Sequence, residues 1–223
     1  MEIIPAILPK DFAELEEKVD AIVGVVPVVQ VDICDGKFVP KPSWPYKKHD
    51  KNFEDILSEE RGLPRWEDID FEMDLMIADP ELELDKWIAS GAKRLIIHFE
   101  STKNMDRIIG ELQGLVEIGI AINLETSVDD IAPFIHDIDI IQCMGIEKIG
   151  FQHNPFDSRV IEKVRELKTR FPEKLVSVDG GISLEHAEEL KAAGADRLIV
   201  GSAIFDSENV PEAIDRFNEV CQN

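Results

Sequence analysis

The sequence lacks the features that mark secreted, membrane-spanning and disulfide-stabilised proteins. It has only three cysteines and no CxxC pair, which fits a reducing cytoplasm better than a disulfide framework. It has no run of about 18 apolar residues, so no helix is expected to span a membrane. The amino-terminal segment MEIIPAILPKDF has no basic stretch followed by an apolar one, so we expect no secretory signal. These absences predict a cytoplasmic protein.

Positive charge is also scarce. The chain has 24 Lys and Arg against 46 Asp and Glu, a net charge of −22. A nucleic-acid partner would require a basic patch, so this class is excluded. The acidity indicates a soluble, self-repelling surface, or else adaptation to a salty habitat. Against this background five lysines fall close together, at Lys37, Lys41, Lys47, Lys48 and Lys51.

What the sequence does contain is a regular alternation of strand and helix patterns. The apolar fraction of 44% supports a sizeable core, and no low-complexity linker divides the chain. Strand patterns are expected at 2–8, 28–33, 71–77, 94–99, 119–124, 139–146, 175–181 and 197–203. Amphipathic stripes between them predict helices, two of which are marked by Phe12, Leu15, Val19 and Ile22 and by Val160, Val164, Leu167 and Phe171.

The expected helix ends carry suitable residues. N-terminal caps are predicted at Asp11, Asp79, Ser127 and Ser183, and glycine stops at Gly24, Gly91, Gly119 and Gly194. Residues 36–70 form one long irregular loop with a short helix near FEDILSEE, and we expect Trp44 and Trp66 to pack this loop down.

Eight strands, each followed by a helix, predict an α/β fold, a single (β/α)₈ TIM barrel spanning residues 1–223. The alternative is a doubly wound open sheet, which usually carries a glycine-rich phosphate fingerprint after the first strand. Here that turn reads PKDF and contains no glycine. The barrel is therefore favoured.

Inward-facing positions near the strand ends are unusually polar. Alternation in VVQVDICD directs Gln30, Asp32 and Cys34 inward, and the same rule directs inward Glu72, Asp74, Met76, Gln142, Met144, Ser177 and Asp179. A single inward aspartate would more often be a satisfied core polar group. Three carboxylates at one barrel mouth repel each other and need a metal, a proton or a base.

Glycine turns follow the last two expected strands. DGGI at 179–182 and VGSAIF at 200–205 each lead into a helix. Backbone N–H groups at this position hold a substrate phosphate in many barrels. Either turn alone is a weak signal, and the two together predict a phosphate site.

The motifs as a set resemble the ribulose-phosphate 3-epimerase family over nearly the whole chain. They are IPAIL, VDICDGKFVP, LMIADPE, IHFES, IGIAINLETSV, IDIIQCMGIEKIGF, VDGGI and GADRLIVGSAIF, in the family's order. The resemblance implies a phosphate-binding barrel that converts D-ribulose 5-phosphate to D-xylulose 5-phosphate, a reaction of the pentose phosphate pathway. It implies Asp32 and Asp179 as catalytic acid and base, and phosphate contacts from Gly150, Gly180, Gly181, Gly201 and Ser202. It places Ala6, Cys34, Met76, His98 and Met144 at the substrate pocket.

The metal ligands depart from the family pattern, which has histidines where this chain has Gln30 and Asp74. The implied metal site is therefore Gln30, Asp32, Asp74 and Asp179, an all-oxygen set that favours Mg²⁺ or Mn²⁺ over Zn²⁺. A relic with no metal is the alternative. Ala6 and Cys34 stand for a family serine and methionine, and Gln152 and His153 stand for loop glycines.

Two functions remain open: a sugar-phosphate 3-epimerase, and a non-catalytic phosphosugar-binding barrel that has lost the metal site. A decarboxylase or aldolase of a related barrel is disfavoured because EMDLM contains no lysine. The expected partner is a small sugar phosphate, with neither nucleic acid nor membrane, and a homo-oligomer stays open. The lysines at 37–51 should form a basic lip that attracts a dianionic substrate, or else a solvated loop.

Overall fold

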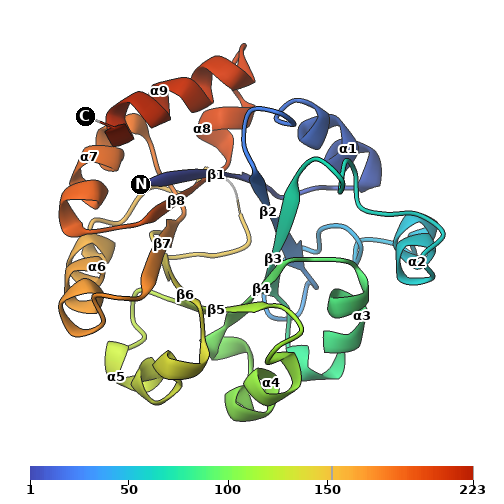
Figure 1. Ribbon diagram of the computed structural model, residues 1–223, viewed down its shortest axis with the longest axis horizontal. Helices are drawn as coiled ribbons and strands as arrows, with labels where there is room; N and C mark the ends of the chain where they lie inside the picture. Colours follow the sequence, from blue (N-terminus) through green and yellow to red (C-terminus); the bar gives the residue numbers. More distant parts are fainter. Residues whose placement is uncertain (152, 223) are drawn as a thin grey trace.

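The eight parallel strands close into a barrel in chain order, as predicted. The computed structural model describes residues 1–151 and 153–222. The strands are β1 (Glu2–Ile7), β2 (Val28–Cys34), β3 (Asp70–Met76), β4 (Arg94–His98), β5 (Glu117–Ile122), β6 (Ile140–Met144), β7 (Leu175–Asp179) and β8 (Arg197–Val200). The closing ladder pairs Glu2 of β1 with Arg197 of β8. Figure 1 shows the strands as an inner ring with the helices around it.

The outer layer consists of helices joined to the strands by short segments. They are α1 (Phe12–Asp20), α2 (Lys51–Leu57), α3 (Leu84–Ala89), α4 (Met105–Leu112), α5 (Val128–Ile131), α6 (Arg159–Arg170), α7 (Leu184–Ala193), α8 (Ser202–Phe205) and α9 (Val210–Gln222), with 3₁₀ turns η1 (Pro80–Leu82), η2 (Phe99–Ser101) and η3 (Ala132–Asp137). In the part of the chain that the structure describes, no helix is long and apolar enough to cross a membrane.

Strand alternation divides the interior into two regions. Outward side chains such as Val31, Met73 and Leu75 join the main core between strands and helices. Inside the barrel, ion pairs between side chains fill the end where the strands begin. Glu72 Oε2 lies 2.7 Å from Arg197 Nη2 and 2.5 Å from Arg94 Nη1. The opposite end is therefore left for the site.

The predicted helix ends are largely confirmed. Asp11 Oδ1 accepts a hydrogen bond from the Glu14 N–H at 3.0 Å, and Ser127 Oγ accepts one from the Asp129 N–H at 3.2 Å. The backbone N–H of Ser183, before α7, donates to His186 Nδ1 at 3.2 Å. The glycines at the expected stops 24, 91 and 194 all have positive φ.

Two predicted ends are wrong. Gly119 lies inside β5, and Gly114 is the glycine with positive φ after α4. A Cβ at Gly119 would stand 2.3 Å from Ile96 Cδ1, so the Ile96 side chain occupies the space beside this glycine inside the barrel. Asp79 precedes η1 with a left-handed backbone (φ 50°) and makes no capping bond with its side chain.

The segment between β2 and β3 is attached to the barrel beside the end of β2. Ser43 Oγ donates to the carbonyl of Asp32 at 2.9 Å and accepts from the N–H of Cys34 at 2.9 Å. Trp44 is buried against Phe12 and Phe53, as predicted. The prediction for Trp66 is wrong, because its ring is 61% exposed. The segment is thus anchored directly beside the aspartate of β2.

Candidate active site

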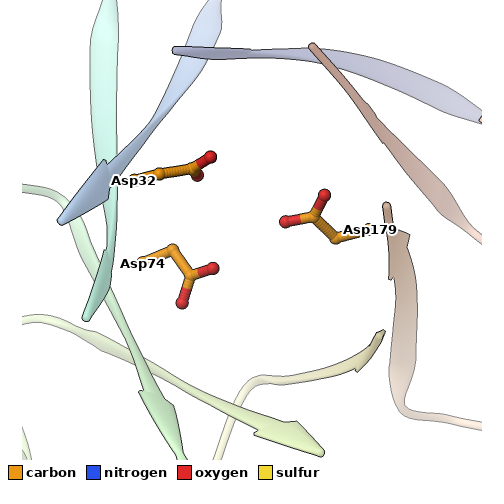
Figure 2. Close-up of side chains that lie close together, drawn as sticks. All are labelled: Asp32, Asp74 and Asp179. Carbon is orange, nitrogen blue, oxygen red and sulfur yellow. The ribbon is translucent and has the colours of Figure 1, made fainter. Parts of the chain in front are cut away.

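Three aspartates meet at the carboxyl end of the barrel. Asp32 on β2 stands opposite Asp74 in the β2–β3 register, and Asp179 ends β7. One carboxylate oxygen from each lies within 4.8 Å of the others. Figure 2 shows Asp32 and Asp74 projecting from neighbouring strands toward Asp179 on the far side. Asp74 is fully buried, whereas the other two are partly exposed.

Two glutamine side chains connect these carboxylates. The Gln30 Nε2 group donates to Asp32 Oδ1 at 3.0 Å and to Asp179 Oδ2 at 2.9 Å. Gln142 Nε2 lies 3.3 Å from both Asp74 Oδ2 and Asp179 Oδ2. The amide oxygens of both glutamines are buried and accept no hydrogen bond within the described residues. Sequence reasoning placed Gln142 inside the barrel but did not include it in the site.

His98, at the end of β4, lies behind Asp74. Its Nε2 atom is 3.0 Å from Asp74 Oδ1, and the ring is completely buried. Burial alone would lower the pKa of His98, but the neighbouring carboxylates, Asp74 first, raise it above its ordinary value. The carboxylates of the cluster therefore favour the positively charged form of the His98 ring.

The aspartates of the cluster bind protons more readily than ordinary aspartates. Burial, and then the charge of Asp74, raise the pKa of Asp32 to about 8. Burial and the charges of Asp32 and Asp74 raise the pKa of Asp179 well above its ordinary value. Like charges at this separation favour a shared proton near neutral pH when no cation is bound.

The donor set fits a hard divalent cation. Three carboxylates come together, and two buried amide oxygens have no partner. Rotating either amide by half a turn would direct its oxygen at the cluster, since amide orientation is an assignment from hydrogen bonding. Hard divalent cations prefer an all-oxygen set of this kind.

A cavity of ≈70 Å³ opens above the aspartates. Asp32 and Asp179 lie in its wall, together with the predicted residues Ala6, Met76, Met144, Gly150, Gly180, Gly181, Gly201 and Ser202. Gly181 has φ 68°, and a Cβ there would stand 2.7 Å from the backbone nitrogen of Phe156. The chain can make this turn only with glycine, which leaves backbone on the cavity side.

Four predicted site residues are not part of the cavity wall. Gln30, Asp74 and His98 are fully buried around the carboxylate cluster, and Cys34 is covered by Val39. Strand alternation correctly predicts that Cys34 faces inward, but the segment after β2 folds back and covers it. Burial also raises the pKa of this thiol, so it stays protonated. Gln152 lies outside the described residues, while its neighbour His153 lines the cavity.

Comparison with known proteins agrees with this architecture. The profile of the "Ribulose-phosphate 3 epimerase family" matches residues 2–205. The chain is 30% identical over 223 residues to ribulose-phosphate 3-epimerase of Bacillus subtilis, covering 96% of both proteins. It is 29% identical over 217 residues to the Schizosaccharomyces pombe enzyme of that name, covering 96% of this chain and 90% of the relative.

A solved structure shares the fold at much lower sequence identity. The crystal structure of KGPDC from Streptococcus mutans in complex with D-R5P superposes with a TM-score of 0.72 at 13% identity, covering 99% of this chain and 96% of the other. The fold and the site together define a (β/α)₈ barrel with a carboxylate cluster at the carboxyl ends of its strands. Within that class, the chain belongs to the ribulose-phosphate 3-epimerase family.

Proposed function

We propose that this protein is a sugar-phosphate 3-epimerase that interconverts D-ribulose 5-phosphate and D-xylulose 5-phosphate. The observation that carries the proposal is the placement of Asp32 and Asp179. Their side chains face each other across the barrel and both line the cavity. Family membership independently supports a sugar-phosphate epimerase.

Inversion at C3 requires a base on one side of the carbon and an acid on the other. The C3 proton is acidified by the adjacent C2 carbonyl, and its removal leaves an enediolate. Burial and mutual repulsion raise the pKa of both Asp32 and Asp179, which brings their proton exchange closer to neutral pH and disfavours ionisation of both at once, as an acid and a base acting in turn require. The ionised group removes the C3 proton, and the protonated group returns one to the opposite face.

Gln30, Asp32, Asp74 and Asp179 would hold the divalent cation, Mg²⁺ or Mn²⁺. When bound, such an ion stabilises negative charge on the substrate oxygens. His98 holds Asp74 in place from behind, and Gln30 spans the gap between the acid and the base. The turn at Gly180 and Gly181, with Gly201 and Ser202 at the start of α8, would bind the phosphate through backbone N–H groups. Gly150 would close over the same group.

The function is tested by exchange of the C3 proton with solvent deuterium. Wild-type protein should catalyse exchange in ribulose 5-phosphate, and Asp32→Asn and Asp179→Asn should each lose about 10²–10⁴-fold in rate. A panel of other ketose phosphates, with and without divalent ions, determines the substrate. No exchange in any member of the panel would reject the epimerase.

A second candidate is a non-catalytic phosphosugar-binding barrel. The observation that favours it is Gln30, whose amide already satisfies both Asp32 and Asp179 without a metal. Calorimetric titration of chelator-treated protein separates the two. Mg²⁺ or Mn²⁺ binding that Asp74→Asn abolishes supports the epimerase site, whereas no divalent binding at millimolar concentration supports the binding protein. With either function, the protein would act in the cytoplasm, since its three cysteines are free thiols.

A further inference from the structure

A second cavity opens beside the active-site cavity. Its volume is ≈320 Å³, and it lies between the end of β1, the segment after β2 and the segment after β6. The two cavities share Leu8, Gly150, Phe151 and His153 as common walls. A cavity of about 300 Å³ is at the small end of the range for ligand sites. The two spaces are therefore direct neighbours.

The wall of the second cavity is basic in an acidic protein. It contains Lys10, Lys41 and Lys47, and among its described lining residues there is no aspartate or glutamate. By contrast, the described cavities elsewhere on the surface each include at least one acidic residue. With 46 acidic residues in the chain, an acid-free wall holding three lysines concentrates positive potential at this one place.

The three ammonium groups are available to a ligand. Within the described residues, none of them lies in an ion pair, although Lys18, Lys86, Lys93 and Lys168 each pair with a carboxylate. Lys41 Nζ lies 5.2 Å from the centre of the Phe151 ring, which holds it at the common wall. Two acids that contact lining residues are already engaged: Asp206 Oδ2 lies 2.8 Å from His153 Nε2, and Glu14 accepts a hydrogen bond from the Lys10 backbone N–H and pairs with Lys18.

We propose that this second cavity, lined by Lys10, Lys41 and Lys47, is a second anion subsite that binds a phosphoryl group. It lies apart from the Gly180–Gly181 and Gly201–Ser202 turns, so a ligand reaching both carries two phosphoryl groups, as a ketose bisphosphate does. Free inorganic phosphate bound beside a sugar monophosphate is the other source of the same chemistry. Lysine ammonium groups bind phosphoryl oxygens as mobile point charges, which suits three lysines on flexible stems. The inference rests on the proposed phosphate-binding turns of the active site.

The test is calorimetric titration of the full-length protein at low ionic strength. Ribulose 1,5-bisphosphate should bind about tenfold more tightly than ribulose 5-phosphate. Lys41→Met with Lys47→Met should remove this preference and leave affinity for the monophosphate within about threefold. The matched control is Lys48→Met with Lys51→Met, which makes the same charge change on the same segment outside the cavity wall. The control should keep the preference.

Inorganic phosphate distinguishes the two sources. In one outcome, the two sugars bind equally tightly, inorganic phosphate binds to the ribulose 5-phosphate complex, and only the Lys41/Lys47 variant loses this phosphate binding. That outcome would assign the subsite to the free anion. No bisphosphate preference and no phosphate binding would overturn the inference, as would equal losses in both variants. The C3 proton-exchange assay tests the epimerase separately from the subsite. Exchange without bisphosphate preference or phosphate binding rejects the subsite alone. Either kind of anion binding without exchange rejects the epimerase alone.

Discussion

Gln142 lies between Asp74 and Asp179 and touches both. Its amide is unusual at an inward strand position, but nothing in the local sequence shows that it contacts the two aspartates. We expect it to act as a positioning residue that orients the two carboxylates toward the cation. Gln142→Leu should weaken Mg²⁺ or Mn²⁺ binding about 10–100-fold, since losing a partner of a metal ligand typically has this effect.

The measurement is calorimetric titration of chelator-treated protein with each ion. Cys143→Ala is the matched control, because Cys143 neighbours Gln142 but packs outward against the helices. An unchanged dissociation constant in Gln142→Leu would show that this amide does not act on the cation ligands.

At the residue scale, the sequence predicts which way the side chains of a strand point, but not which residues they contact. The alternation in VVQVDICD was enough to turn Gln30, Asp32 and Cys34 inward, because side chains alternate strictly along a strand. It could not show that Gln30 reaches Asp179, 149 positions away, or that Val39 covers Cys34. Those contacts depend on barrel closure and on the path of the segment after β2.

The turn after β7 brings two glycines of positive φ to the cavity. A Cβ at Gly181 would collide with the backbone at Phe156, whereas a Cβ at Gly24, which has φ 78°, would meet nothing within 4 Å. Both substitutions strain the backbone by about 1 kcal/mol. Only Gly181→Ala should also displace the proposed phosphate turn and raise KM for ribulose 5-phosphate by about tenfold or more.

Steady-state kinetics measure KM in Gly181→Ala and Gly24→Ala, and urea denaturation measures the stability of both variants. Both variants should lose stability, and Gly24→Ala should keep the wild-type KM. Equal KM values in the two variants would remove the turn from the site.

The order of elements was predictable because each repeat combines a period-2 strand with an amphipathic helix. The errors came where tertiary packing decided the role of a residue. Gly119 is predicted as a helix stop, yet it lies inside β5 with the Ile96 side chain packed beside it. Trp66 was read as a packing residue because it is apolar, but α2 and the end of the loop leave its ring at the surface.

The carboxylate cluster makes the stability of the whole molecule depend on pH. The pKa of Asp32 is about 8 in the folded chain against an ordinary value of 3.8, so between these values the folded state binds more protons than the unfolded state. The free energy of unfolding therefore falls as pH rises through this range, and the stabilising effect of the proton is lost above about pH 8.

Thermal denaturation of chelator-treated protein at pH 6, 7 and 8 measures this effect. The expected Tm decreases along the series, and Asp74→Asn should flatten the trend, because the charge of Asp74 is one cause of the raised pKa. A Tm that rises from pH 6 to 8 would contradict the charged cluster.

The net charge of −22 should make stability depend on salt as well. Going from about 0.01 M to about 0.15 M salt shortens the screening length from about 30 Å to about 8 Å. Self-repulsion of the folded chain should weaken, and Tm should rise with sodium chloride at constant pH. A Tm independent of salt would mean that local ion pairs, such as Arg94 with Glu72, already neutralise the field.

The ladder between β1 and β8 also sets an order of events during translation. β1 is the first strand of the barrel to leave the ribosome, but its outer partner is β8, and Arg197 follows Glu2 by 195 positions. Until those residues are synthesised, one edge of β1 has no partner, and α9 cannot yet pack behind it. An open strand edge is a template for association with other chains. A ribosome stalled between residues 150 and 195 should therefore hold an unclosed barrel that recruits chaperones, and emergence of β8 should close the ring in a single late step.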